Sequence, residues 1–201
     1  LRMLYALMKP DAGTITVDNV DAVRDPQGAQ AYLGVLPDPS GLYPRLTARE
    51  HIRYYGELQG VSGAALTQRT DQLLQLLDMG GIADRRAGGF SHGERTKVAV
   101  ARALVHSPRN VLLDEPTNGL DVMSTRAVRE IIRRLRAEGH CVVFSSHVMQ
   151  EVSALCDRII VMAKGRIAAA GTPDEIRALT GHENLEDAFV ALAGFETEAQ
   201  Q

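Results

Sequence analysis

The chain has 201 residues, a length that fits one large domain or one domain with a small appendage. Its 22 lysines and arginines against 25 aspartates and glutamates leave a net charge of −3, which argues against a broad basic face for nucleic acid. Hydrophobic residues make up 45% of the sequence, as in globular domains with a core, and no apolar run approaches the roughly 18 residues of a membrane span. We also expect no signal peptide.

The first residues of the chain carry a helical pattern. Apolar side chains from Leu1 to Met8 recur at helical spacing, and Pro10 ends the pattern. No capping residue precedes this stretch, so we expect a helix whose beginning is missing and a chain that is a fragment of a longer one. The alternative is a true N-terminus that frays.

Two short strands and a turn-rich loop are predicted next. Residues 14–18 alternate between polar and apolar side chains, which favours a strand. Residues 32–36 form a short apolar run, which predicts a second strand. The loop over residues 37–41 is dense in turn residues and contains Asp38.

Three helices are expected between this loop and residue 108. Thr47 and Glu50 form a capping box that opens the first, and a leucine stripe predicts the second over about residues 64–79. Ser91 and Glu94 form another capping box, which opens a helix that Pro108 closes.

The middle of the sequence predicts two buried strands with a helix between them. Residues 111–113 are wholly apolar, which is typical of a strand buried on both faces. An arginine-rich amphipathic helix follows and ends at Gly139. Residues 141–144 are predicted as the next buried strand. Cys141, which begins it, and Cys156 are both expected to be buried, reduced thiols of a cytosolic protein.

The last part of the chain predicts smaller elements. A short helix over residues 149–155 precedes strands over residues 158–162 and 166–170, and Thr172 with Glu175 caps a further helix. One more amphipathic stretch follows Gly181, and Gln200 and Gln201 are expected to fray. Strands that alternate with helices predict an α/β domain with a largely parallel sheet.

Polar residues follow the two predicted buried strands. Asp114 and Glu115 come after one strand, and His147 comes after the next. Ligands collect at the carboxyl ends of parallel strands, and a carboxylate pair there is costly without a cation or a polarised water. The pair therefore predicts Mg²⁺ on Asp114 and a water activated by Glu115, although an Asp-Glu pair by itself can also mark a strand that leaves the core. Ser91 and the free amides of its helix end suit a phosphate.

Taken together, these segments resemble the nucleotide-binding subunit of ATP-binding cassette (ABC) transporters. The matching segments are Phe90-Ser91-His92-Gly93-Glu94 (signature), Val111-Leu112-Leu113-Asp114-Glu115-Pro116 (Walker B), Gly119-Leu120-Asp121 (D-loop) and Ser145-Ser146-His147 (switch histidine). The resemblance implies a P-loop NTPase-like α/β fold, with a mostly parallel sheet flanked by helices. It implies an ABC ATPase domain over residues 1–173, with a helical subdomain at about 48–106 and a C-terminal helical extension over 174–201.

The resemblance implies ATP hydrolysis, with ATP and Mg²⁺ as cofactors. Asp114 would bind Mg²⁺, mainly through water, and Glu115 would be the general base for the hydrolytic water. His147 would contact the γ-phosphate and stabilise its developing charge.

The family also implies a second binding surface, supplied by an opposing subunit. Ser91 and Gly93 would bind the γ-phosphate of ATP held by that subunit, so that each ATP lies between two chains. Glu94 would support the signature loop, and Asp121 would couple the two sites across the dimer interface.

Three features depart from the family pattern. The phosphate-cradling motif G-x-x-G-x-G-K-[ST] is absent from the 201 residues and is expected just upstream of Leu1. The usual glutamine of the metal-sensing loop is Asp38, which could bind a metal or be a simple turn residue. His92 stands where the signature usually has its first glycine.

The resemblance implies a head-to-tail dimer and a transmembrane permease partner, with no nucleic acid. Residues 42–47 resemble exporters of the sodium- and drug-efflux type, so we expect a cytoplasmic protein that binds the inner face of the cell membrane through the permease. The chain as given is expected to be inactive without the phosphate loop. Two alternatives are a non-catalytic dimerisation or docking module and a soluble, non-transport ABC ATPase.

Overall fold

The computed structural model describes residues 1–38 and 41–194. The chain divides into two compact units, Leu1–Ser145 and Ser146–Gln201, and each is described by itself.

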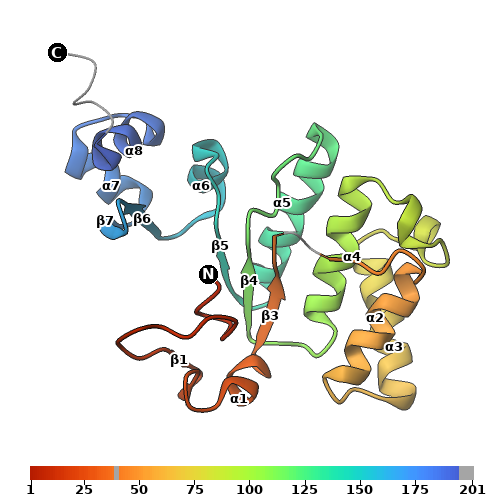
Figure 1. The fold of residues 1–201 in the computed structure, drawn as a ribbon. Helices are drawn as coiled ribbons and strands as arrows, with labels where there is room; N and C mark the ends of the chain where they lie inside the picture. Colours follow the sequence, from red (N-terminus) through yellow and green to blue (C-terminus); the bar gives the residue numbers. More distant parts are fainter. Residues whose placement is uncertain (39–40, 195–201) are drawn as a thin grey trace. The chain divides into compact units, whose positions relative to one another are not determined.

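A three-stranded parallel sheet forms the centre of the first unit (Figure 1). Its order is β3 (Leu33–Leu36), β4 (Asn110–Leu113) and β5 (Cys141–Phe144). The register aligns Leu36 with Leu113 and Leu113 with Phe144, so the three strands end level with one another. The residues that follow each strand therefore emerge at one edge of the sheet.

The central strand is buried as expected, but β5 is not. Val111, Leu112 and Leu113 of β4 are all at most 4% exposed. In β5, Cys141 is exposed and Val143 is 41% exposed, so the expectations of a fully buried strand and a buried Cys141 are wrong. The physical reason is that burial alternates along β5, with Cys141 and Val143 exposed and Val142 and Phe144 partly buried, so only one face of the strand is covered. Both cysteines are free thiols, and Cys156 is half-buried.

Three helices form a group beside this sheet (Figure 1). They are α2 (Ala48–Leu58), α3 (Gly63–Leu76) and α4 (His92–Leu104), and α4 also packs on β3. Gly56 lets them approach closely, because a Cβ there would lie 2.3 Å from Leu66 and 3.0 Å from Val105. Short 3-10 turns at η1 (Gly80–Ile82) and η2 (Ala87–Gly89) connect α3 to α4. The helix α5 (Val122–Ala137) packs beside β5 and buries Val128, Ile132 and Leu135.

Two connecting segments run side by side within the helical group. The Arg49 amide donates to the Ala83 carbonyl (2.9 Å), and the Ala87 amide donates to the Leu46 carbonyl (2.8 Å). The Gly88 amide donates to the Pro44 carbonyl (3.0 Å), and Thr47 forms an antiparallel bridge with Arg86. We call these paired segments, residues 44–49 and 83–88, the strap.

The N-terminal residues do not form the predicted helix. Residues 1–8 make hydrogen-bonded turns, with Ala6 in a left-handed conformation at φ 57°, and Leu7 is 66% exposed. A segment this short is a marginal helix in water unless it packs against other elements, and Tyr5 is its one buried side chain.

The predicted strand over residues 14–18 is shorter than expected and belongs to a hairpin. Strand β1 (Thr16–Val17) pairs antiparallel with β2 (Val20–Asp21), through a turn at Asp18 and Asn19 that both have positive φ. The helix α1 (Pro26–Gln30) was not predicted, although Asp25 caps it and Pro26 opens it.

The second unit contains the elements predicted for it. Its helices are α6 (Met149–Leu155), α7 (Pro173–Thr180) and α8 (Leu185–Ala193). Strands β6 (Ile159–Ala163) and β7 (Arg166–Gly171) form a separate antiparallel hairpin, which packs with α7 and α8 around Val161 and Ile176. Gln200 and Gln201 lie outside the described residues.

Candidate functional site

The end of β4 holds the predicted carboxylate pair in a defined network. Asp114 extends the pairing of β4 with β3 by one hydrogen bond, in which its amide donates to the Leu36 carbonyl (2.9 Å). The hydroxyl of Ser145, the residue after β5, donates to Asp114 Oδ1 (2.7 Å). The same hydroxyl oxygen accepts from the Glu115 amide (2.8 Å). One serine thus orients the carboxylate of Asp114 and the backbone of Glu115.

The backbone of Glu115 is held in a strained conformation. Its φ is 47°, in the left-handed region that costs a non-glycine residue about 1 kcal/mol or more. Glu115 lies where the chain turns sharply out of the buried strand, and the Asn118 amide donates back to its carbonyl (3.1 Å). The chain therefore turns directly after Asp114.

The predicted phosphate-binding end of α4 is a complete capping box. Ser91 Oγ accepts from the Glu94 amide (3.2 Å), and Glu94 Oε2 accepts from the Ser91 amide (2.8 Å). The amides of His92 and Gly93 lie between these two residues in the first turn. Because the first amides of a helix lack partners within it, they suit an anion at this end.

The N-termini of α4 and α5 lie against one another. Gly93 is buried, and a Cβ on it would lie 2.3 Å from Ser124 Oγ. His92 Nε2 lies 3.1 Å from the Asn118 carbonyl, and since a carbonyl only accepts, Nε2 is the donor. The predicted signature and the segment that leads to Asp121 are therefore brought together within this unit.

Asp121 caps α5. Its Oδ1 accepts from the amides of Met123 and Ser124, both at 2.9 Å, and Oδ2 accepts from the Ser124 hydroxyl at 2.7 Å. These bonds, with the Ser124 hydroxyl first, lower the pKa of the Asp121 carboxyl below its usual value. Asp121 thus has a structural role in its own helix, which the sequence reading did not assign to it.

The two other predicted site residues, Asp38 and His147, are both exposed. Asp38 is exposed, two residues beyond the end of β3. His147 is exposed in a bend before α6 and belongs to the second unit, where the neighbouring Ser146 hydroxyl oxygen accepts from the Val148 amide (3.0 Å). Among residues 1–38 and 41–194, no group of three or more His, Cys, Asp or Glu side chains is arranged to hold a metal ion.

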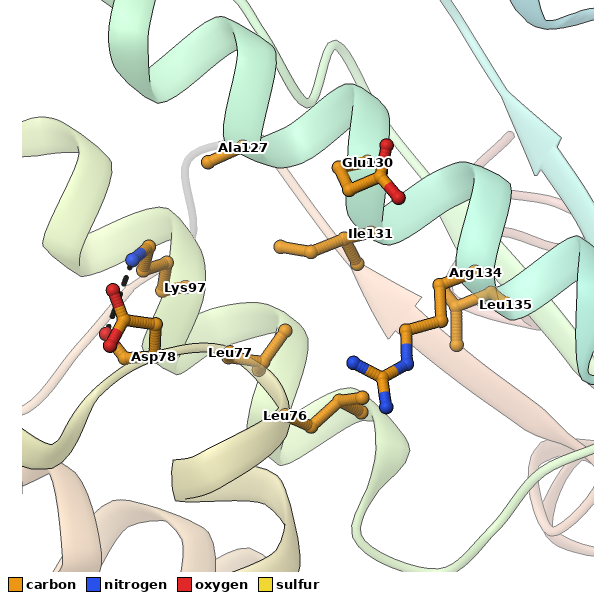
Figure 2. Close-up of a pocket in the computed structure, with 9 residues that line it drawn as sticks. All are labelled: Leu76, Leu77, Asp78, Lys97, Ala127, Glu130, Ile131, Arg134 and Leu135. Carbon is orange, nitrogen blue, oxygen red and sulfur yellow. Dashed lines mark hydrogen bonds between the residues drawn. The ribbon is translucent and has the colours of Figure 1, made fainter.

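A pocket of about 230 Å³ lies elsewhere in the first unit (Figure 2). The end of α3, α4 and α5 line it with apolar side chains that include Leu77 and Ile131. Lys97 donates to the Asp78 carbonyl (3.2 Å) at its rim. None of its lining residues belongs to the predicted site.

Comparison with known proteins assigns the family. The profile of the family described as "ABC transporter" matches residues 1–118. The chain belongs to the ABC transporter family. The ATP-binding domains of this family bind and hydrolyse ATP and drive transport. The family membership inferred from the motifs is therefore confirmed.

Individual relatives agree with this assignment. The ABC transporter ATP-binding protein NatA of Bacillus subtilis is 41% identical over 95% of this chain and 78% of its own length. ABC transporter A family members 5 and 8 of Arabidopsis thaliana are 35% and 32% identical over 90% of this chain. This chain spans only about a fifth of the length of those two plant proteins.

Solved structures confirm the fold. A structure described as the ATP-binding subunit of an ABC transporter superposes with a TM-score of 0.85 at 27% identity, over 95% of this chain and 80% of that one. A dimeric ATP-binding cassette in a post-hydrolysis state, bound to ADP and Pi, gives a TM-score of 0.76 at 23% identity over 85% of this chain and 78% of that chain. The α/β fold predicted from the sequence is therefore that of an ABC ATPase. In the part of the chain that the structure describes, no helix is both long and apolar enough to cross a bilayer.

Two residues of this ABC ATPase domain were missed by sequence reasoning. Ser145 was seen only as part of a motif, because nothing in the sequence states the register that places it opposite Asp114. Arg85 donates to Glu94 Oε1 (2.9 Å) and to the Gly89 carbonyl (3.3 Å). Nine residues separate Arg85 from Glu94 in the sequence, so no local pattern pairs them.

Proposed function

We propose that this chain is the ATP-hydrolysing subunit of an ABC exporter and works on a separate transmembrane permease. The observation that carries the proposal is the network at the end of β4, where Ser145 orients Asp114 and the backbone of Glu115. The Asp114 carboxylate and the Glu115 backbone are thus held in place, in a family that hydrolyses ATP.

Glu115 and His147 have different roles in the proposed reaction. Glu115 accepts a proton from the attacking water, which is the role of a general base. His147 donates to the γ-phosphate and stabilises the charge that develops on it. Both roles follow from the family resemblance and from their places after β4 and β5.

Asp114 fits a magnesium site. Mg²⁺ is usually held by one or two carboxylates together with waters and substrate phosphates, and Asp114 offers one carboxylate that Ser145 fixes through Oδ1. When bound, the ion would neutralise phosphate charge. Asp38 follows the neighbouring strand β3 and is the second candidate ligand.

A second copy of the chain completes each site in this proposal. Ser91 and Gly93 present the first turn of α4 to the γ-phosphate of ATP held by the opposing subunit, and Asp121 caps α5, whose Ser124 lies against Gly93. A head-to-tail dimer places two such surfaces over two ATP molecules. The amides and the dipole of α4 supply the attraction without a basic patch.

We infer that the permease docks on the loops near Asp38 to Arg45, and that the protein works at the cytoplasmic face of the membrane. The sequence of residues 42–47 resembles that of sodium- and drug-efflux cassettes, which supports export as the direction. The ABC ATPase domain in this proposal spans residues 1–173, with α2, α3 and α4 as its helical subdomain and residues 174–201 as a C-terminal helical extension.

Substitution Glu115→Gln tests the catalytic role. Because the amide cannot take a proton from water, we expect ATP turnover of the full-length protein to fall by about a hundredfold or more, with Mg-ATP binding retained. Steady-state phosphate release and equilibrium ATP binding measure the two effects. The control is Glu130→Gln, which changes an exposed α5 carboxylate that pairs with Arg133. Turnover near the wild-type rate in Glu115→Gln would contradict the role given to Glu115.

A further inference from the structure

The signature end of α4 contains a charge that does not suit a phosphate. Glu94 lies in the first turn of α4, three residues after the Ser91 cap, and its carboxylate accepts from the Ser91 amide (2.8 Å). An acid in this position stabilises a helix, because it opposes the roughly half positive charge of the N-terminus. The same charge weakens the attraction of that terminus for any other anion.

Arg85 compensates this charge directly. Its Nη1 donates to Glu94 Oε1 (2.9 Å), while the Ser91 amide occupies Oε2, so both carboxylate oxygens are bound. These two donors, the Ser91 amide first, lower the pKa of the Glu94 carboxyl, which therefore stays ionised at neutral pH. The guanidinium of Arg85 thus offsets the negative charge of Glu94 at this helix end.

Arg85 also holds the loop that leads into α4. Its Nη2 donates to the Gly89 carbonyl (3.3 Å), and its guanidinium lies over the Phe90 ring at 5.6 Å. The backbone on either side of Arg85 is fixed in the strap, where Ala83 accepts from Arg49 and Arg86 bridges to Thr47. The Arg85 side chain thus contacts both Gly89, in the loop before the Ser91 cap, and Glu94, in the first turn after it.

We propose that Arg85 is a positioning residue for the phosphate-binding end of α4, where it neutralises Glu94 and so restores the affinity of this helix end for ATP. The proposal rests on the proposed function, in which Ser91 and Gly93 bind the γ-phosphate. Arg85 acts through Glu94 and the loop and does not touch the nucleotide. Its side chain is 51% exposed, so the ion pair contributes little to folding stability, and its effect is expected in nucleotide binding.

A double-substitution cycle on the full-length protein separates charge compensation from a merely structural role. Arg85→Gln leaves the Glu94 charge uncompensated, so the KM for Mg-ATP should rise about three- to tenfold, with a smaller change in kcat. In Glu94→Gln the charge is gone, but the side-chain oxygen can still accept from the Ser91 amide, since glutamine also forms capping boxes. The KM of Arg85→Gln/Glu94→Gln should therefore match that of Glu94→Gln.

Arg85→Lys is the conservative variant in this cycle. Lysine loses the planar fork that reaches Glu94 and Gly89 together, but it keeps the positive charge. Because the proposal attributes the KM shift to charge, we expect Arg85→Lys to show only a small part of the rise in KM seen in Arg85→Gln. Added salt should shrink the difference in KM between Arg85→Gln and wild type, because both side chains are partly exposed.

Two results would overturn the role of Arg85. One is an unchanged KM in Arg85→Gln. The other is a rise in KM on Arg85→Gln that is equally large in the wild-type protein and in the Glu94→Gln variant. That result would assign Arg85 a purely structural role in the loop. A full-length protein that turns over no Mg-ATP would instead overturn the proposed function, and this proposal with it.

Discussion

At the scale of single residues, His51 shows how a buried polar group fixes its own protonation state. The ring is fully buried, and Nε2 accepts from the Tyr43 amide (2.9 Å), which can only donate. Nδ1 must then carry the proton, which it donates to the Thr47 carbonyl (2.8 Å). The neutral ring joins the loop before α2 to the cap of that helix.

This arrangement makes stability depend on pH. Burial, opposed by the bond to Thr47 and reinforced by Arg102, lowers the pKa of His51 below its unfolded value of about 6.5. The unfolded chain therefore binds more protons, and the free energy of unfolding should fall as pH drops from about 6.5, by at most about 1.4 kcal/mol per pH unit for one histidine. Urea unfolding at about pH 5.5 and about pH 7.5 measures the difference.

The matched variant is His51→Gln, whose amide oxygen can accept from Tyr43. Its stability should decline less steeply on acidification than that of the wild type. A residual decline is expected from His106, whose pKa burial also lowers. Equal pH dependence in the two proteins would show that His51 does not cause the effect.

At the scale of elements, the contact of α4 with α5 depends on the lack of a side chain at Gly93. In Gly93→Ala the new Cβ would lie 2.3 Å from Ser124 Oγ and 2.9 Å from Ser124 Cβ, so one of the two helices must shift. We expect a loss of about 1–3 kcal/mol in the free energy of unfolding, measured by urea denaturation. Gly81→Ala is the control, because a Cβ there meets nothing within 4 Å.

A second substitution locates the clash. Ser124→Gly removes both atoms that a Cβ at residue 93 would meet, so it should recover part of the loss caused by Gly93→Ala. Strictly additive effects of the two substitutions would place the cause elsewhere.

Elements with a local signal could be predicted, and those that depend on distant partners could not. The capping boxes at Thr47, Ser91 and Thr172 predicted where three helices begin, because their hydrogen bonds lie within four residues of sequence. The helix expected over residues 1–8 and the burial of Cys141 failed, because apolar pattern does not say whether another element covers the segment. The role of Ser145 depends on strand register, which a single sequence does not state.

At the scale of the whole molecule, the 201 residues contain most of an ABC ATPase fold but no G-x-x-G-x-G-K-[ST] motif. In P-loop NTPases the backbone amides of that loop cradle the phosphates. We therefore expect isothermal titration of Mg-ATP into the 201-residue chain to show no micromolar site, and its ATP turnover to be at background. Micromolar binding would contradict this expectation. A folded chain that failed to bind ATP but still dimerised or docked would favour the alternative of an interaction module.

The strap has a mechanical consequence for the first unit. Its backbone links join the segment before and into α2 to the segment that leads toward Ser91, and they are spaced along both segments. A force along the segments loads all of these bonds at once, whereas a force that peels one end loads them one after another. A sliding displacement of one segment therefore strains the bonds to the other, so the start of α2 and the loop before Ser91 are mechanically linked.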